Sequence, residues 1–179
     1  MKKQYKQPKI PIKKQVNVDK EKGFYKLNGL TKQDIDYLLA NKYKEFSAHS
    51  ILSNKKEKYL IKPRFNESPQ HFFLIHDIAE YLKKFTDKIQ LFETKKPDIV
   101  FKIKNKRYAI EVETGTMLTR IKALEERKIY LDENYDEWFF VITNKNKVKD
   151  YKKLGDAVDK RYVRLRLNKL LKTAKKIQR

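Results

Sequence analysis

Between residues 96 and 115, apolar side chains recur at every second position, a pattern that predicts two β-strands. In each strand they share one face: Ile99, Phe101 and Ile103 in the first, Tyr108, Ile110 and Val112 in the second. Asn105-Lys106 lies between the strands and is typical of a tight turn, although the usual glycine is missing. The stretch is therefore expected to form a β-hairpin with one apolar face.

The opposite face of this hairpin is acidic. By the same alternation it carries Asp98 from the first strand and Glu111 and Glu113 from the second. Three carboxylates on one face repel each other, and their burial costs desolvation energy. A hard divalent cation would remove that cost, because such ions prefer oxygen ligands. The hairpin is thus a candidate metal site.

Helical periodicity dominates the rest of the chain. We expect helices at 31–46, 47–54, 68–86, 116–134, 147–158 and 161–178, and further strands at 57–62 and 89–93. Trp138 to Thr143 is almost continuously apolar, as in a strand buried on both faces. Because a helix precedes this strand, it should pair in parallel with the second hairpin strand. The expected fold class is α/β, with a mixed sheet flanked by helices.

The charge of the chain indicates what kind of partner it binds. The formal net charge is +21, with 44 Lys plus Arg against 23 Asp plus Glu, which favours a polyanion and most simply nucleic acid. The alternative is a lysine-rich surface that serves solubility in a composition-biased genome. The absence of cysteine excludes disulfides and thiolate metal sites. With neither a secretory signal nor a membrane-spanning apolar run, a soluble, cytoplasmic protein without a membrane partner is expected.

Four segments are expected along the chain: residues 1–22, 23–66, 67–159 and 160–179. Residues 1–22 read as a basic flexible arm that either lies along phosphates or is a disordered tail. Residues 23–66, with two helices and a strand, resemble a small winged helix-turn-helix module whose second helix would read the DNA major groove. The alternative is a helical extension that packs on the following core. DNA contacts in this module are expected from Lys55, Lys56 and Arg64.

The last segment, residues 160–179, holds nine Lys plus Arg and no acidic residue. Its apolar positions predict a helix with one packed side. The basic side could clamp a DNA or RNA backbone. The candidate contacts are Lys160, Arg161, Arg164, Arg166, Lys169 and Lys172.

Pro97-Asp98 followed by Glu111-Val112-Glu113 resembles the PD-(D/E)xK nuclease superfamily. The family pattern is Pro-Asp, a strand turn, then Asp or Glu, one residue, and Lys. The resemblance implies a restriction-endonuclease-like core over residues 67–159, hydrolysis of DNA phosphodiesters, and Mg²⁺ or Mn²⁺ held by Asp98 and Glu111 with help from Glu113. Glu113 occupies the position where Lys is usual, so the match departs from the pattern there.

Two helix residues enter the candidate site through this resemblance. A Glu on the helix before the sheet often reaches the metal in these nucleases, which makes Glu80 a candidate; the alternative is a solvated helix charge. In several branches the catalytic Lys has moved to the following helix, and Lys128 interrupts the apolar stripe there. That stripe consists of Met117, Ile121, Leu124 and Leu131. Lys128 would orient the attacking water or neutralise phosphorane charge. The alternative is a lysine that snorkels at the edge of the core, while Lys122 should face away.

His71 and His76 are interpreted as structural, or as flanking a phosphate path, rather than as metal ligands. The order of a helix-turn-helix, a helix with His71, Pro-Asp, Glu-x-acid-x-Gly-Thr and Lys-x-Tyr also resembles the replication-relaxation proteins of mobile elements. The expected function is therefore a metal-dependent DNA endonuclease or a nuclease-like DNA-processing protein of a mobile element. Many such nucleases act as dimers, so a homodimer is compatible with the resemblance.

Two other classes of function stay open. One is a non-catalytic DNA-binding factor for replication, transfer or regulation that keeps a degenerate nuclease fold, which Glu113 at the Lys position favours. The other is a structural, RNA-associated basic protein, which would leave the acidic hairpin unexplained.

Overall fold

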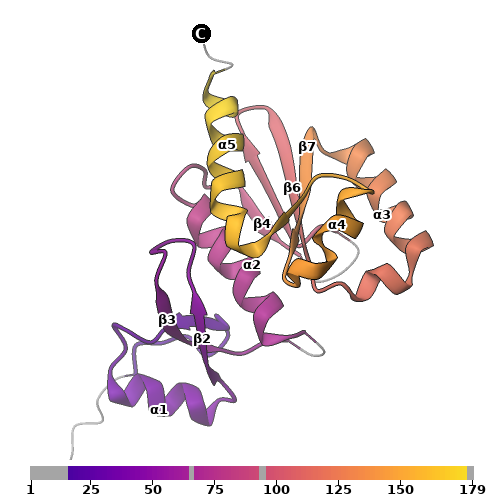
Figure 1. Ribbon diagram of the computed structural model, residues 1–179. Helices are drawn as coiled ribbons and strands as arrows, with labels where there is room; N and C mark the ends of the chain where they lie inside the picture. Colours follow the sequence, from indigo (N-terminus) through magenta and orange to yellow (C-terminus); the bar gives the residue numbers. More distant parts are fainter. Residues whose placement is uncertain (1–15, 65–66, 93–95, 177–179) are drawn as a thin grey trace, which may run out of the picture.

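The structure is a computed structural model that describes residues 16–64, 67–92 and 96–176, with side chains described as far as residue 173 (Figure 1). The first half contains β1 (Phe24–Lys26), α1 (Lys32–Ala40), β2 (Lys44–His49), β3 (Lys56–Ile61), α2 (Pro69–Leu82), β4 (Ile89–Leu91) and β5 (Ile99–Ile103). The second half contains β6 (Lys106–Glu113), η1 (Thr116–Thr119), α3 (Ile121–Asn134), β7 (Glu137–Ile142), η2 (Lys145–Lys147), α4 (Val148–Lys152), β8 (Ala157–Asp159), η3 (Lys160–Tyr162) and α5 (Val163–Lys176).

The main sheet has five strands in the order β4-β5-β6-β7-β8. β4, β5 and β6 are antiparallel neighbours, whereas β7 and β8 continue the sheet in parallel. The expected α/β class, with a mixed sheet flanked by helices, is confirmed. The prediction of a helix over 147–158 is wrong at its end, because α4 stops at Lys152 and residues 157–159 form the edge strand β8.

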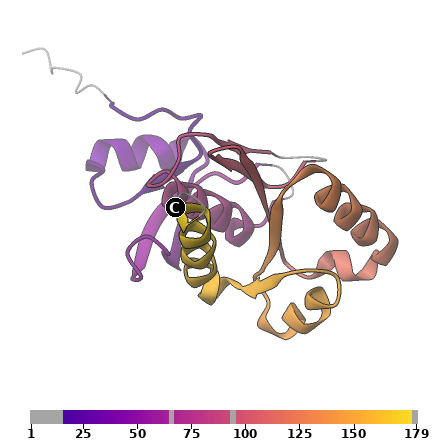
Figure 2. The same cartoon turned by 90° about the horizontal axis from the view of Figure 1, so that it is seen from above.

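Helices cover both faces of this sheet. Figure 2 shows α2 and α5 on one side and α3 on the other. The side under α2 and α5 buries Ile99, Phe101, Tyr108, Ile110, Val112, Phe139 and Val141. The side under α3 and α4 buries Val100, Ala109, Phe140 and Ile142. β7 is thus buried on both faces and lies parallel to β6, as its continuous apolar run predicts.

The central hairpin forms as the alternation predicts. β5 and β6 pair antiparallel from Ile99↔Ile110 to Ile103↔Lys106, so the turn is Lys104-Asn105, one residue earlier than expected. Lys104 adopts a φ of +56° in place of the missing glycine. At the other end Gly115, at φ +99°, lets the chain leave β6. Since the apolar residues of the hairpin face α2 and α5, Asp98, Glu111 and Glu113 lie on the α3 face.

The N-terminal module is a three-stranded antiparallel sheet, β1-β3-β2, with α1 beside it. The helix expected over 31–46 forms as α1, which the capping box of Thr31 and Asp34 opens, but it ends at Ala40 rather than at residue 46. The predicted second helix at 47–54 is wrong, because these residues complete β2 and form the turn to β3. The expected recognition helix is therefore absent from residues 47–54, all of which the structure describes.

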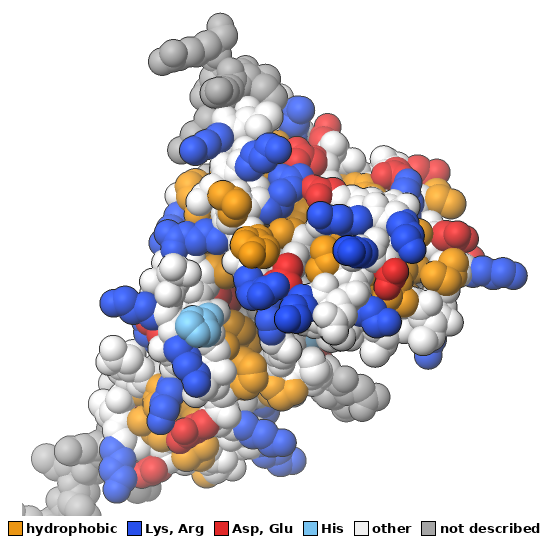
Figure 3. Space-filling model, viewed as in Figure 1, with side chains coloured by type: hydrophobic (Ala, Val, Ile, Leu, Met, Phe, Trp, Pro, Cys, Tyr) orange, Lys and Arg blue, Asp and Glu red, His pale blue; other side chains and the backbone are white. Residues whose placement is uncertain are grey.

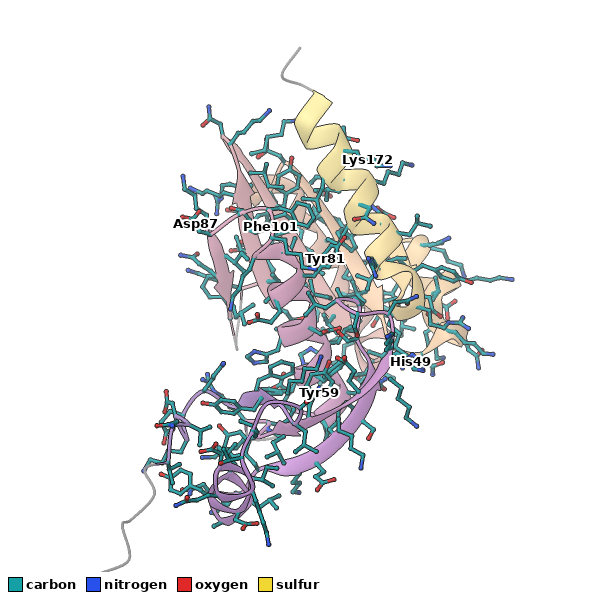
Figure 4. All side chains as sticks on the ribbon, turned by 90° about the vertical axis from the view of Figure 1, so that its left-hand side faces the viewer. His49, Tyr59, Tyr81, Asp87, Phe101 and Lys172 are labelled. Atoms are coloured by element: carbon teal, nitrogen blue, oxygen red, sulfur yellow. The ribbon has the colours of Figure 1, made fainter. Side chains whose placement is uncertain are left out.

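α2 connects the module to the main sheet. Its first turn packs Phe72 and Phe73 against the small sheet, whereas its later turns pack on the large one. The buried carboxylate of Asp77 accepts hydrogen bonds from Ser50 Oγ and Ile51 N, both at 2.7 Å. Figure 4 shows Tyr59 inside the module and Tyr81 and Phe101 inside the main body. No helix in the described residues is long and apolar enough to cross a membrane.

Candidate functional site

A cleft of about 390 Å³ opens on the α3 face of the main sheet, where β5 begins and β6 ends. Residues of α2, the hairpin, η1 and α3 line it: His71, Asp98, Glu111, Val112, Glu113, Thr114, Thr116, Met117, Ala123 and Arg127. The structure thus brings together the three carboxylates that the alternation places on one face. Four segments that are distant in sequence contribute to this one site.

Asp98 is held at the start of β5 by the neighbouring strand. Its Oδ2 accepts a hydrogen bond from Val112 N at 2.7 Å, and its own backbone N donates to Glu111 Oε2 at 3.2 Å. Each carboxylate thus accepts a backbone N–H from the opposite strand, which fixes the two side chains next to each other. Asp98 keeps 18% of its side-chain surface exposed toward the cleft, whereas Glu111 keeps 6%. The pair therefore combines one accessible and one buried carboxylate.

Burial raises the pKa of Glu111 to about 8, and the negative charge of Asp98 acts in the same direction. Arg127 opposes this shift through an ion pair between its Nε and Glu111 Oε1. The same guanidinium donates from Nη2 to the backbone oxygen of Lys96 at 2.6 Å. Arg127 is 19% exposed, so its charge lies at the border between the buried carboxylate and the open cleft.

Glu113, at the end of β6, is half-buried in the cleft. Burial raises its pKa, while the hydrogen bond from Tyr151 Oη to Glu113 Oε2, at 2.9 Å, acts in the opposite direction. Tyr151 is fully buried in α4, and burial raises the pKa of its phenol as well. At the position where the resemblance would place a lysine, the chain therefore has a carboxylate with a neutral hydrogen-bond donor.

His71 connects the first turn of α2 to the carboxylates. Its Nδ1 lies 2.8 Å from Glu67 Oε1 and its Nε2 lies 3.4 Å from Asp98 Oδ2. Burial alone would lower the pKa of His71, but the contacts with Asp98 and Glu67 raise it to about 10. The expectation of a non-ligand role that flanks a phosphate path is compatible with this cationic imidazole. Its direct contact with Asp98 could not be foreseen from the sequence.

The prediction that Lys128 points into the carboxylate cluster is wrong. Its ammonium pairs with Asp132, one helical turn further along α3, and 39% of the side chain is exposed. Glu80 does not line the cleft either: its carboxylate pairs with Lys83 on the exposed side of α2. The first alternative for Glu80, a solvated helix charge, describes this geometry. His76 stacks on Phe24 and contacts Phe72 at a tilted angle, and burial lowers its pKa to about 4.

The residues expected to contact nucleic acid fall into two groups. Lys55, Lys56, Arg64, Lys169 and Lys172 are exposed, with Lys160 and Arg164 partly so. Arg161 is paired with Asp159 at 2.8 Å, and Arg166 with Glu137 at 2.6 Å and Asp156 at 2.7 Å. Arg166 also covers the ring of Phe139 at 4.8 Å, so it stabilises the core rather than projecting from it. Figure 3 shows Lys and Arg side chains over both the module and the main body.

Within the described residues, no group of three or more His, Asp or Glu side chains is arranged as a ready metal site. The residues that could hold a divalent cation are Asp98 and Glu111, with Glu113 behind them. Comparison of the chain with protein-family models, with curated proteins and with solved structures gave no match.

Proposed function

We propose that the protein is a metal-dependent nuclease that hydrolyses DNA phosphodiesters in the cleft around Asp98 and Glu111. The observation that carries this proposal is the convergence of the two carboxylates, Arg127 and His71 in one open cleft. The surrounding order also supports it, since a helix, a strand, a hairpin, a second helix and a parallel strand follow each other as the resemblance to PD-(D/E)xK nucleases implies. The net charge of +21 favours a polyanionic substrate.

The donor set fits Mg²⁺ or Mn²⁺. Both ions take carboxylate oxygens, and Mg²⁺ typically uses one or two carboxylates and keeps several waters. Asp98 and Glu111 would supply such a pair. Burial and the negative charge of Asp98 raise the pKa of Glu111 despite its ion pair with Arg127, and a divalent cation between the two carboxylates would oppose this shift. A divalent cation bound there would polarise the phosphate and lower the pKa of a nearby water.

Arg127 and His71 would act on the phosphate from two sides. Arg127 already lies at the cleft border, and a guanidinium is suited to bidentate contact with phosphate oxygens. There it would stabilise the charge that develops on the phosphorane. His71, held cationic by Glu67 and Asp98, would fix the orientation of the Asp98 carboxylate and attract the phosphate. These two residues would do the work expected of Lys128.

A second candidate function is a DNA-binding protein with a degenerate nuclease site. Two contacts favour it. The ion pair with Arg127 already neutralises Glu111, and Glu113 is satisfied by Tyr151 instead of being a lysine. In this case the cleft would be a structural ion-pair network, and the basic surface would carry the function.

One experiment separates the two. Plasmid, linear and branched DNA, and RNA of the same sequence, are incubated with the protein in Mg²⁺, Mn²⁺ or EDTA. The nuclease proposal expects products in Mg²⁺ or Mn²⁺, none in EDTA, and none from the Asp98→Asn variant. DNA binding without cleavage under all conditions would establish the degenerate-site alternative instead.

A further inference from the structure

Three basic residues form a row across β4, β5 and β6 at the end of the sheet remote from the cleft. Lys102 and Arg107 are direct cross-strand partners in the hairpin. Lys88, immediately before β4, accepts the backbone hydrogen bond of Lys102 N at 3.0 Å and is therefore the next member of the row. All three are exposed, and they line one hollow of about 480 Å³ together with Asp87, Ile89, Gln90, Val100 and Phe101.

Such a row is unfavourable by itself. Side chains directly opposite each other in a sheet have Cβ atoms about 4.5–5.5 Å apart, and like charges at that spacing destabilise the pair. Among the described residues, no ion pair joins Lys88, Lys102 or Arg107 to a carboxylate. Asp87 lines the hollow, and Asp136 uses its Oδ2 to accept the backbone N–H of Arg107 at 2.7 Å. The hollow thus sets three cations against one lining carboxylate, which favours an anionic ligand.

The row lies on the same face of the sheet as the carboxylate cleft. Lys102 follows Asp98 by four residues along β5, which at about 3.3 Å per residue places it about 13 Å away. The guanidinium of Arg107 covers the ring of Tyr135 at 5.1 Å, on the side packed by α3. Figure 4 shows Asp87, which marks this hollow, at the outer edge of the sheet and away from Tyr59 of the N-terminal module.

On the surface between the basic row and the carboxylate cleft, basic side chains lie against aromatic rings. Lys96 lies over Phe92 at 4.7 Å, and Arg127 lies 5.9 Å from the ring of Tyr130. Phe92 and Tyr130 are only partly buried and pack beside Val100, which lines the hollow. Basic side chains interleaved with aromatic ones suit a nucleic-acid strand, whose phosphates and bases need both.

We propose that Lys88, Lys102 and Arg107 bind backbone phosphates of the nucleic-acid strand whose reacting phosphodiester lies at Asp98 and Glu111. This assignment rests on the proposed function and adds the course of the substrate to it. A distance of about 13 Å corresponds to about four phosphates of a stacked strand, at 3.4 Å each. The strand would thus run along β5 from the cleft to the hairpin end, away from the N-terminal module.

The test compares two double variants that each lower the net charge by two. Lys88→Gln/Lys102→Gln changes the row, whereas Lys149→Gln/Lys152→Gln changes exposed residues of α4, beside the opposite edge strand β8. Binding of a labelled 12-nucleotide strand is measured in EDTA between 50 and 200 mM salt. The row variant should bind at least about fivefold more weakly at 150 mM salt, with a salt slope smaller by about 1.4, because two phosphate contacts of a single strand are lost. The α4 variant should stay close to wild type.

Two further measurements use a shorter strand and free inorganic phosphate. Because the row lies about four phosphates from the cleft, a trinucleotide held at the cleft cannot reach it, so wild type and row variant should cleave a trinucleotide at the same rate. Calorimetry with inorganic phosphate at constant ionic strength should show no difference between them. If phosphate alone binds wild type and not the row variant, while the salt slope of the 12-nucleotide strand is unchanged, the row is a site for free phosphate and the inference is overturned.

The two proposals fail in different ways. If wild type binds no nucleic acid, the proposed function fails together with this inference. If wild type binds and cleaves but the row and α4 variants behave alike, the inference fails and the nuclease proposal stands. The melting temperature of the row variant should equal or exceed that of wild type, because the substitution removes like-charge repulsion. A decrease would contradict the repulsion from which the row was inferred.

Discussion

Glu111→Gln offers the sharpest test of the cleft, because it should stabilise the protein while it removes a candidate metal ligand. Glu111 is almost fully buried, next to Asp98 and Arg127. Glutamine has nearly the same shape but no charge. Its effect on the free energy of unfolding therefore reports what the buried negative charge costs the fold in the absence of metal.

The magnitude follows from the pKa of Glu111, which burial raises from 4.5 to about 8. A raised carboxyl pKa contributes stability that is complete below pH 4.5 and is lost as the pH rises through 8. The difference of 3.5 units, at about 1.36 kcal/mol per unit, sets a ceiling of about 5 kcal/mol. Glu111→Gln should therefore match wild type near pH 4 and exceed it by about 1–5 kcal/mol at pH 9.

The assay is urea unfolding of both proteins at pH 4, 6, 7.5 and 9, in EDTA. Mg²⁺ at tenfold its dissociation constant should then stabilise wild type by about 1.4 kcal/mol at pH 9 and the variant by clearly less. The contributions of other titrating groups cancel in the difference between the two free energies of unfolding, because both proteins contain these groups. A Glu111→Gln variant that is less stable than wild type at pH 9 would show that the ion pair with Arg127 outweighs the burial of the charge. The buried charge of Glu111 would then be no argument for a bound metal cation.

Three other outcomes are expected. Asp98→Asn should abolish cleavage but leave DNA binding equal or stronger in a filter-binding assay, because it removes a metal ligand and a charge that repels phosphate. Arg127→Met should lower the single-turnover cleavage rate by about 10²–10³, the usual cost of a lost transition-state donor, whereas Lys128→Met should change it less than about threefold. Asp77→Ala should lower the urea midpoint, since Ser50 Oγ and Ile51 N each lose a buried partner at a cost of about 1–3 kcal/mol; Asp77→Asn should lose less.

The central hairpin was predictable because one local rule determines it. Alternating side chains place Asp98 and Glu111 on the same face whenever the two strands pair in register, and the apolar face leaves a single register that buries it. The expected parallel partner β7 and the helices before and after the hairpin follow from equally local patterns. Fold class and the candidate carboxylates are therefore readable from residues 68–143.

The N-terminal module was not readable in the same way. Ser47 resembles a helix N-cap and Ile51 and Leu52 a helical stripe, but in β2 the inward residues are Phe46 and Ala48, which pack on the aromatic core beneath the small sheet. The alternation of β2 is short and carries only one large apolar residue. Pairing with β3 determines the conformation of β2, and no local sequence pattern predicts that pairing.

Arg127 and Lys128 illustrate how a small error in helical phase moves a functional assignment by one residue. Leu124 and Leu131 are the two buried positions of α3. At 100° per residue, Arg127 and Lys128 lie about 50° to either side of the line that joins them, so these leucines alone do not choose between the two.

The other two members of the expected stripe, Met117 and Ile121, favoured Lys128, because both lie on its side of that line when one continuous helix is assumed. The chain does not form one helix there. Met117 lies in η1, and Arg120, at φ −125° and ψ 59°, breaks the helix before α3 begins, which leaves Ile121 exposed. Met117 thus lies outside α3, and Ile121, its first residue, does not pack on the sheet, so neither residue indicates which side of α3 is buried. Only the position of α3 over the sheet, which Tyr130, Leu131 and Tyr135 fix by packing near Val100 and Ala109, shows that the guanidinium rather than the ammonium reaches Glu111.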